Sequence, residues 1–497
     1  MQSRTAVVIG SGPAGVASAR ALVERGLRPI VLDGGRRLEP ERSAAIGHVD
    51  VDELRRSFSV DLDTLPLKPV HGSTYAYAPD QVHADGFGAV PSLAVGGLSN
   101  VWGAAMLPFA QRDHDGWPFG PEALEPHYRA VLRFVPLAGE HDELAATHPL
   151  HCDPPRLLAT QQVASLLADV RRNATRLRGA GVVGGRSRLA VSVARCDYTG
   201  LCLLGCPHDA IWSSAQTLRE LTEAALLDHR PGAVVERIEE RAGRVRLHLR
   251  TSEILDADIV FVAAGALGTT RLMLASLGAH DRDVKLLDSA YYTFPAFRWR
   301  GSRIEVGNTL AQVFLEIEDP RTSPNPVHLQ VYGYNDLMLR AAAARLRLSE
   351  AKAARVLAPV LRRLLFIQGY LHSDESPGAR AQLAPDGALR IHAEAGDTEE
   401  RVARVISKVR SLRRELRIEP MAAMLRIWPP GKGFHVGGSF PMRCTPEGLE
   451  TDIHGRLAGF ENVHLVDSAI FPTIPARTIT LAEMANAHRI ACETVEG

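Results

Sequence analysis

Residues 5–35, TAVVIGSGPAGVASARALVERGLRPIVLDGG, decide the fold of this chain. The apolar run AVVI is typical of a buried parallel strand. Gly10, Gly12 and Gly15 follow with the spacing G-x-G-x-x-G, and Ala and Leu residues then recur at helical intervals. A second apolar strand, PIVLD, ends at Asp33, near the usual offset of about 20 residues for an acid that binds ribose. This order predicts a dinucleotide-binding βαβ unit.

Each of the three glycines in the motif has its own physical role. Gly10 permits the tight turn, Gly12 lets a pyrophosphate approach the backbone, and Gly15 lets the helix pack on the strand. The helix N-terminus then offers free N–H groups and a positive dipole end to the anion. FAD and NAD are bound by the same motif, so the motif alone does not identify which dinucleotide binds.

The composition is that of a globular protein. The chain has 497 residues, 45% of them hydrophobic, and 57 basic residues balance 57 acidic ones. The length predicts more than one domain, and the zero net charge predicts no nucleic-acid partner. We find no apolar stretch of membrane-spanning length and no signal-peptide pattern, so we expect a cytoplasmic protein with reduced thiols.

Three later segments resemble signatures of the glucose-methanol-choline (GMC) flavoprotein oxidoreductases. Residues 256–278, DADIVFVAAGALGTTRLMLASLG, resemble a family signature, and residues 433–442, GFHVGGSFPM, resemble the H-x-x-G segment with the active-site histidine. Residues 457–491 resemble the C-terminal flavin-binding strand and helix. The resemblance implies that the dinucleotide is FAD.

A fourth match, VGGLSNVWGAAM at residues 95–106, resembles the segment that runs along the flavin ring. Small residues suit this place, because a planar ring packed on backbone leaves no room for Cβ groups. The segment is most similar to that of sugar-oxidising members. Some of these carry a flavin-linked histidine where this chain has Val101, so we expect non-covalent FAD.

The resemblance also implies the other cofactor contacts. Val235 would lie against the adenine through its backbone, and Asp467 would lie near the ribityl and pyrophosphate groups. The complete set of implied FAD contacts outside the N-terminal motif is Gly97, Ser99, Asn100, Val235, Ala264, Gly265, Asp467 and Thr478.

Three of the six cysteines stand within residues 196–206, CDYTGLCLLGC. On the ferredoxin run C-x2-C-x2-C-x3-C-P, Cys196, Cys202 and Cys206 take the first, third and fourth places, and Thr199 takes the second. Three thiolates suit a [3Fe–4S] cluster, which lacks one corner iron. The spacing also resembles that of the GMC-type catalytic subunits of bacterial sugar dehydrogenases, which carry such a cluster.

Two glycines favour this interpretation, because Gly200 and Gly205 would let the loop turn its N–H groups toward sulfur. Two alternatives stay open: a cysteine loop that binds no metal, and a zinc site completed by His208. Reduced FAD holds two electrons, and a cluster would pass them on one at a time to a separate acceptor. The presence of a cluster would therefore favour a dehydrogenase over an oxidase. The remaining cysteines, Cys152, Cys444 and Cys492, are expected to be ordinary buried thiols.

The catalytic pair is only half present. GMC enzymes move the hydroxyl proton of an alcohol to a histidine and its C–H hydride to flavin N5, and His435 takes the place of that base. The second family residue, His or Asn, is replaced by Ile474. Arg477 is the nearest polar candidate, since a fixed cation could bind an anionic substrate group. An outward ion pair is the alternative for Arg477.

The predicted fold class is α/β. A Rossmann-like FAD-binding domain is interleaved with an α+β substrate domain whose antiparallel sheet roofs the flavin, as the GMC resemblance implies. The FAD-binding domain takes residues 1–110, 187–283 and 431–497, including the cysteine loop, and the substrate domain takes 111–186 and 284–430. Aromatic and β-branched residues predict strands within 289–301, 310–318, 328–334 and 364–373, and a D-G hairpin at 383–393.

Residues 336–363 predict one basic amphipathic helix, broken or kinked by Pro359. It could lie on an anionic membrane surface or on an acidic electron acceptor, and an ordinary solvated helix face is the simpler interpretation.

The leading hypothesis is an FAD-dependent dehydrogenase that oxidises a hydroxyl of a sugar or sugar-like alcohol, with electrons leaving through a [3Fe–4S] cluster to an external acceptor such as a protein. The alternatives are an oxygen-using GMC oxidase without a cluster and a flavin electron-transfer subunit with no substrate of its own.

Overall fold

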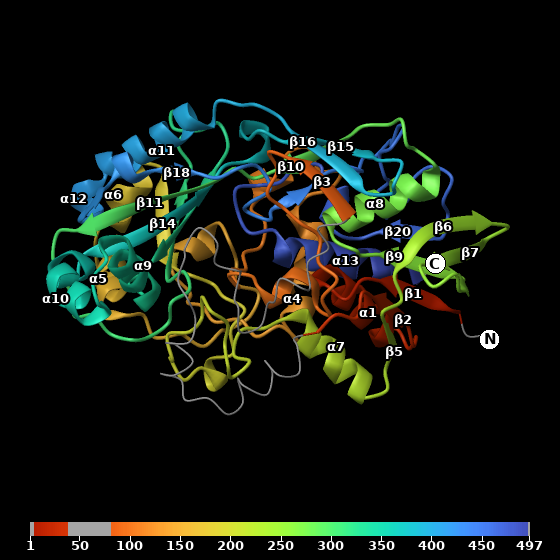
Figure 1. Cartoon of the computed structure of the whole chain (residues 1–497), viewed down its shortest axis with the longest axis horizontal. Coiled ribbons are helices and arrows are strands. Elements are labelled where there is room, and N and C mark those ends of the chain that lie inside the picture. Colours follow the sequence, from red (N-terminus) through yellow and green to blue (C-terminus); the bar gives the residue numbers. More distant parts are fainter. Residues whose placement is uncertain (1–3, 38–80, 496–497) are drawn as a thin grey trace.

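A five-stranded parallel sheet joins the two ends of the chain to its middle (Figure 1). The computed structural model describes residues 4–37 and 81–495, so part of the predicted segment 1–110 lies outside the described residues. The strand order is β20 (Val463–Leu465), β9 (Ile259–Val262), β1 (Ala6–Ile9), β2 (Ile30–Asp33) and β5 (Asp228–Pro231). β1 and β9 are buried along their whole length, as interior strands of a parallel sheet should be. The strands predicted at AVVI and before Asp33 are confirmed.

Helices pack around this sheet. α1 (Pro13–Glu24) begins directly after the glycine turn, with Pro13 in its first turn, where a missing N–H costs nothing. α1 packs against α13 (Thr480–Val495), which also contacts α4 (Glu125–Val131). α8 (Ala266–Leu277) follows β9, and α7 (Ser214–Glu223) contacts α1.

The glycine turn is closed by backbone-on-backbone contact. Gly10 has φ +106°, and a Cβ built there would lie 2.1 Å from the carbonyl oxygen of Ala263. A Cβ on Gly15 would lie 2.0 Å from the carbonyl oxygen of Gly10, whereas one on Gly12 would meet nothing within 4 Å. Gly10 and Gly15 are therefore required by packing, and Gly12 faces open space.

The largest sheet is antiparallel and lies at the opposite end of the molecule in Figure 1. It contains every strand predicted for the substrate domain from aromatic and β-branched residues. Its strands are β17 (Ile418–Pro420), β11 (Tyr291–Arg298), β14 (Leu364–Tyr370), β13 (Val327–Tyr332), β12 (Val313–Ile317) and β4 (Val182–Arg186), with β18 (Arg426–Ile427) paired to β11.

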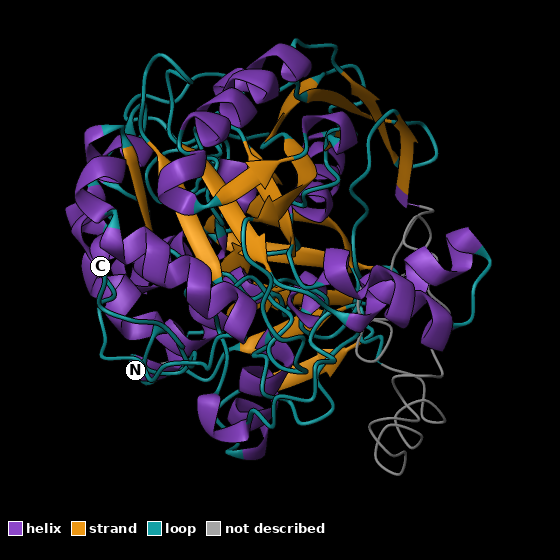
Figure 2. Cartoon of the chain, turned by 90° about the vertical axis from the view of Figure 1, so that its left-hand side faces the viewer, coloured by secondary structure: helices purple, strands orange, loops and turns teal. Residues whose placement is uncertain are grey.

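One face of this antiparallel sheet forms a second hydrophobic core. Alternate residues such as Leu315, Leu329 and Ile367 pack there with apolar residues of α5 (Gln161–Arg172), α6 (Ala174–Gly179), α11 (Thr398–Ser411) and α12 (Arg413–Leu416). Figure 2 shows the strands running through the middle of the molecule with helices on the outside. The opposite face of the sheet does not contribute to this second core.

Two smaller sheets complete the described chain. One contains β19 (Val436–Gly437), β10 (Val284–Asp288), β15 (Ala379–Leu383), β16 (Leu389–Ala393) and β3 (Val82–Asp85). The other contains β6 (Val235–Arg241), β7 (Arg244–Leu249) and β8 (Ile254–Ala257). The predicted D-G hairpin is confirmed: β15 and β16 pair antiparallel, and Gly387 in their turn has φ +84°.

The single basic helix predicted over residues 336–363 is wrong. The structure has two helices, α9 (Asp336–Leu346) and α10 (Glu350–Leu361). Arg347 takes a left-handed conformation after α9, and the Ser349 hydroxyl accepts a hydrogen bond from the N–H of Lys352 to cap α10. The N-cap preference of Ser349 starts a new helix, while Pro359 lies inside α10 without ending it. Among the described helices, none combines the length and apolar character needed to cross a membrane.

Gly10→Ala and Gly12→Ala form a matched pair that tests the glycine turn. Gly10→Ala should lower the free energy of unfolding by at least about 1–3 kcal/mol, because Ala must adopt a strained φ and displace the Ala263 carbonyl. Gly12→Ala should change it by no more than about 0.5 kcal/mol, since its Cβ meets no atom. Denaturant unfolding of nucleotide-free protein measures both, and equal effects would contradict this assignment of the two glycines.

Candidate active site

The predicted dinucleotide residues converge on one edge of the parallel sheet. Because β1, β2, β9 and β20 run parallel, their carboxyl ends meet there, which is where open α/β sheets bind ligands. Gly10 follows β1, Asp33 ends β2, Ala264 and Gly265 follow β9, and Asp467 follows β20.

Asp33 keeps one carboxylate oxygen available. Its Oδ1 accepts a hydrogen bond from the N–H of Gly35 at 2.9 Å. Its buried Oδ2 lies 3.2 Å from Nε2 of His229 but forms no hydrogen bond with it. β5 pairs Asp33 with Pro231, and the chain soon reaches Val235 at the start of β6. An acceptor for ribose and the backbone proposed to meet adenine thus lie on the same side of the sheet.

Glycines surround an open space beside the turn. Added Cβ atoms at Gly12 and Gly265 would meet nothing within 4 Å, and one at Gly97 would lie 3.4 Å from Cα of Gly12. The Ser99 hydroxyl donates to the Gly96 carbonyl, and the Asn100 amide donates to the carbonyls of Val95 and Gly97. These two side chains fix the shape of the 95–106 segment, so contacts with a cofactor there would come from its backbone.

Buried polar groups gather near the start of α13. Burial raises the pKa of Asp467 to about 6, and its carboxylate accepts hydrogen bonds from the Thr269 hydroxyl and the N–H of Ala469. Burial and the nearby Asp467 raise the pKa of Glu483 to about 8. The buried hydroxyl of Thr478 has no hydrogen-bond partner in the described protein. The open glycine cradle and these groups fit a bound dinucleotide.

The imidazole of His435 is buried beside the antiparallel sheet. Its ring stacks on Tyr370 with the ring centres 4.6 Å apart, and its Nδ1 is buried without a hydrogen-bond partner among the described residues. Burial, with a smaller contribution from His328, lowers the pKa of His435 to about 3. At neutral pH the His435 imidazole is therefore unprotonated, and its Nδ1 can accept a hydrogen bond.

Ile474 lies close to the histidine segment but offers it nothing polar. Its side chain is fully buried, and its Cδ1 lies 3.0 Å from the position that a Cβ on Gly437 would occupy. Its backbone exchanges hydrogen bonds with Ser373. The polar partner of His435 must come from another element.

The antiparallel sheet supplies a polar face in that place. Glu316 on β12 lies opposite His328 on β13. On β14, Tyr370 lies opposite His328, and Gln368 lies opposite Gln330. These side chains therefore share one face of the sheet. The same face carries Tyr332, whose hydroxyl oxygen lies 4.0 Å from the position of a Cβ on Gly103, within the predicted flavin segment. We define this set as the polar roof: Glu316, His328, Gln330, Tyr332, Gln368 and Tyr370.

Three hydrogen bonds along the polar roof run in one direction, from the Tyr332 hydroxyl toward the Glu316 carboxylate. Glu316 accepts from Nδ1–H of His328 at 2.6 Å, which leaves Nε2 of His328 to accept from the Gln330 amide at 3.2 Å. The Gln330 amide oxygen in turn accepts the Tyr332 hydroxyl proton at 3.0 Å. Since its proton is committed, the Tyr332 oxygen faces the site as a hydrogen-bond acceptor. Sequence reasoning missed these residues, although the alternation in HLQVY and FIQGY is a usable signal.

Arg477 anchors this network and does not face the site. Its guanidinium donates to Asp113, to Glu316 and to His148. Burial alone would raise the pKa of Glu316, but Arg477 and His328 lower it to about 2. The charge of Arg477 is therefore matched by buried carboxylates, and its surroundings do not support the predicted contact with an anionic substrate.

The cysteine loop is folded around its sulfur atoms. Gly200 and Gly205 have φ +74° and +118°, as predicted for a ligand loop, and Tyr198 is also left-handed. Burial raises the pKa of the Cys196 and Cys206 thiols, and backbone N–H groups directed at each sulfur oppose that shift. The N–H of Ala210, for example, lies 3.3 Å from Sγ of Cys206.

The residues that follow this loop are hydrogen-bonded to the predicted flavin segment. The indole N–H of Trp102 donates to the carbonyl of Trp212 at 2.9 Å, and the two indole rings meet edge to face. Ser214 donates to the carbonyl of Gly96 and lies 2.9 Å from the Ser99 hydroxyl oxygen. On its other side, the Cys202 thiol donates to Asn308 at 3.7 Å.

The zinc alternative for this loop is disfavoured. One zinc ion needs two thiolate sulfurs within about 4.6 Å of each other. In the described part of the chain, the sulfurs of Cys196, Cys202 and Cys206 do not form, with or without His208, a group within 4.8 Å of one another. His208 lies 3.5 Å from Asp197 instead. A cluster holds each thiolate on a separate iron, so wider spacing suits it.

Comparisons with known proteins agree with this geometry. The chain is 27% identical, over 99% of its length and 75% of theirs, to uncharacterised GMC-type oxidoreductases from two strains of Mycobacterium tuberculosis. Its fold matches that of pyridoxine 4-oxidase from Mesorbium loti with a TM-score of 0.62 and 14% identity, over 99% of both chains. No family model matches the chain. The comparisons thus support a GMC-type oxidoreductase with the expected mixed α/β fold.

Arg477→Met should test the anchoring role of Arg477. Removing one partner of a buried ion pair leaves uncompensated charge, so we expect the free energy of unfolding to fall by about 3–5 kcal/mol. Arg246→Met, at an exposed ion pair with Asp256, should change it by less than about 0.5 kcal/mol. Denaturant titration measures both. An Arg477→Met protein of unchanged stability that had lost only binding of acidic substrates would restore the substrate role.

Proposed function

We propose, from the similarity to GMC-type oxidoreductases and the geometry above, that the protein is an FAD-dependent dehydrogenase. Its substrate would be a sugar or sugar-like alcohol, and electrons would leave through a [3Fe–4S] cluster to an external acceptor. One observation carries the proposal: Trp212 and Ser214, a few residues after the three-cysteine loop, are hydrogen-bonded to the segment along which the flavin ring is expected to lie.

The glycine cradle is the proposed FAD site. Gly12 and Gly265 would leave the backbone open to the cofactor, while Gly10 and Gly15 hold the turn by close packing. Asp33 would offer the ribose its Oδ2, which accepts no hydrogen bond within the described protein. When bound, FAD would supply the acceptor for the hydride that leaves the alcohol carbon. The chain's own part is to hold the cofactor, orient the hydroxyl group and take up its proton.

His435 would take that proton, and the polar roof would orient the substrate. The neutral imidazole has a free nitrogen, and the Tyr332 oxygen accepts a second hydroxyl because its own proton is held by Gln330. A substrate with several hydroxyl groups suits this row of amide and phenol groups. Because Arg477 is already neutralised, the site favours a neutral substrate over an anionic one.

The cysteine loop would provide the electron exit. Cys196, Cys202 and Cys206 would ligate the cluster, and the N–H groups aimed at the sulfurs of Cys196 and Cys206 would stabilise negative charge on it. A bound cluster would relay electrons one at a time. The Trp102–Trp212 contact fixes the loop against the flavin segment, so the two centres would be held in a constant relation.

Anaerobic mixing with a panel of neutral sugars, polyols and sugar acids tests the catalytic proposal. At least one neutral compound should bleach the flavin absorbance. His435→Ala should keep its flavin but slow this reduction about 10²- to 10⁴-fold, because the proton acceptor is lost. His392→Ala, at an exposed strand position, should react like the wild type. Flavin that no compound reduces would favour the electron-transfer subunit instead.

Iron and acid-labile sulfide in protein purified without air test the exit route. We expect about three irons and four sulfides per chain, the content of a [3Fe–4S] cluster. Cys206→Ser should lose most of the iron, while Cys152→Ser, which changes a half-buried thiol outside the loop, should keep it. Iron-free protein whose reduced flavin is rapidly reoxidised by oxygen would instead support the oxidase alternative.

A further inference from the structure

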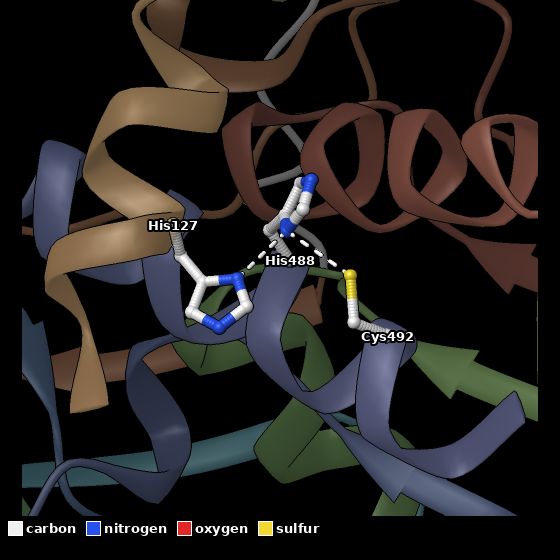
Figure 3. Close-up of side chains that lie close together, drawn as sticks. All are labelled: His127, His488 and Cys492. Carbon is white, nitrogen blue, oxygen red and sulfur yellow. Dashed lines mark hydrogen bonds between the residues drawn. The ribbon is translucent and has the colours of Figure 1, made fainter. Parts of the chain in front are cut away.

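A second cluster of metal-type ligands lies away from the polar roof. The Nδ1 atoms of His127 and His488 are 2.9 Å apart, and Sγ of Cys492 lies 3.3 Å from Nδ1 of His488 (Figure 3). These three atoms all lie within 4.8 Å of one another. We propose that His127, His488 and Cys492 bind a zinc ion that joins α4 to α13.

Local structure explains why the three side chains meet. His488 and Cys492 are four residues apart on α13, so they share one face of that helix. His127 projects from α4, which packs on α13. Cys492 and His488 are buried, and His127 is half-buried and open to solvent on one side, which gives an ion a path of entry. Cys492 is buried, as predicted, and its sulfur contacts His488.

A neighbouring carboxylate prepares His488 as a ligand. Nε2 of His488 lies 3.4 Å from Oε2 of Glu24 on α1. A proton on Nε2 directed at this carboxylate leaves the Nδ1 lone pair facing Cys492 and His127. Histidines that bind metals commonly donate their other ring N–H to a carboxylate in this way. The arrangement distinguishes the cluster from a chance meeting of three side chains.

The distances between the three ligand atoms would have to increase only slightly to admit a zinc ion. Tetrahedral zinc with bonds of about 2.0 Å to nitrogen and 2.3 Å to sulfur places neighbouring ligand atoms about 3.3–3.6 Å apart. The observed separations of 2.9 and 3.3 Å would widen by a few tenths of an ångström. Two imidazoles and a thiolate are ligands that zinc prefers, and the fourth position would be left to water.

Charged groups of both signs surround the cluster. Arg489 pairs with Glu493 at 2.7 Å, and Arg133 lies 3.5 Å from Glu24. Glu24 reaches from α1, so the ion would fasten three helices of the nucleotide-binding region.

Zinc titration of the full-length protein, after treatment with a chelator, tests the proposal. Wild-type protein should retain about one zinc per chain through gel filtration. His127→Ala and Cys492→Ser should each lose it, whereas Cys206→Ser should keep it while losing iron. Glu24→Gln should retain the site but bind zinc about ten- to a hundredfold more weakly in competition with a chromophoric chelator.

Cobalt substitution gives a second readout that does not depend on stability. Co²⁺ bound at this site should show thiolate-to-cobalt charge-transfer absorption that is present in Cys152→Ser and absent in Cys492→Ser. His127 is only half-buried, so His127→Ala should fold and still report on the site. Zinc affinity that is unchanged in both His127→Ala and Cys492→Ser, or protein that never retains zinc, would overturn the proposal. Neither result would affect the proposed oxidation.

Discussion

The close contact between two backbone turns is the constraint on which the nucleotide-binding half depends. Gly10 faces the carbonyl of Ala263, so the turn after β1 and the turn after β9 touch without any intervening side chain. That contact holds the carboxyl ends of strands from distant parts of the sequence in one plane. It also leaves Gly12 and Gly265 beside open space, where a phosphate group can approach the peptide N–H groups.

The buried cation Arg477 has the corresponding role toward the antiparallel sheet. It lies just before α13 and reaches Glu316 on β12 and Asp113 near the start of the second predicted domain. By keeping Glu316 ionised, it sets the tautomer of His328 and, through Gln330, the direction of the Tyr332 hydroxyl. A residue with no access to substrate can thus determine which hydrogen bonds the site offers.

The cysteine loop connects to both halves of the molecule. Trp212 and Ser214 bind it to the predicted flavin segment, while Cys202 meets Asn308 from the stretch that leads into β12. A loop held on two sides undergoes little rearrangement when its ligands bind or release charge. Such rigidity suits a one-electron relay better than it suits a flexible surface loop.

The sequence by itself determined the features that short-range physics controls. The G-x-G-x-x-G turn, its flanking strands, the D-G hairpin and the positive φ of Gly200 and Gly205 each follow from the conformational limits of neighbouring residues. The cap at Ser349 is equally local, but the single helix predicted over residues 336–363 overlooked it.

Only the tertiary structure decided which polar groups meet. Arg477 contacts Asp113 and Glu316 across 364 and 161 residues, and His127 meets His488 across 361. No local pattern encodes such pairings, because they arise from the packing of helices and sheets that are far apart in the chain. The alternation of polar residues along β13 and β14 was visible, but the direction that this face takes, toward His435, depends on how the two large sheets pack.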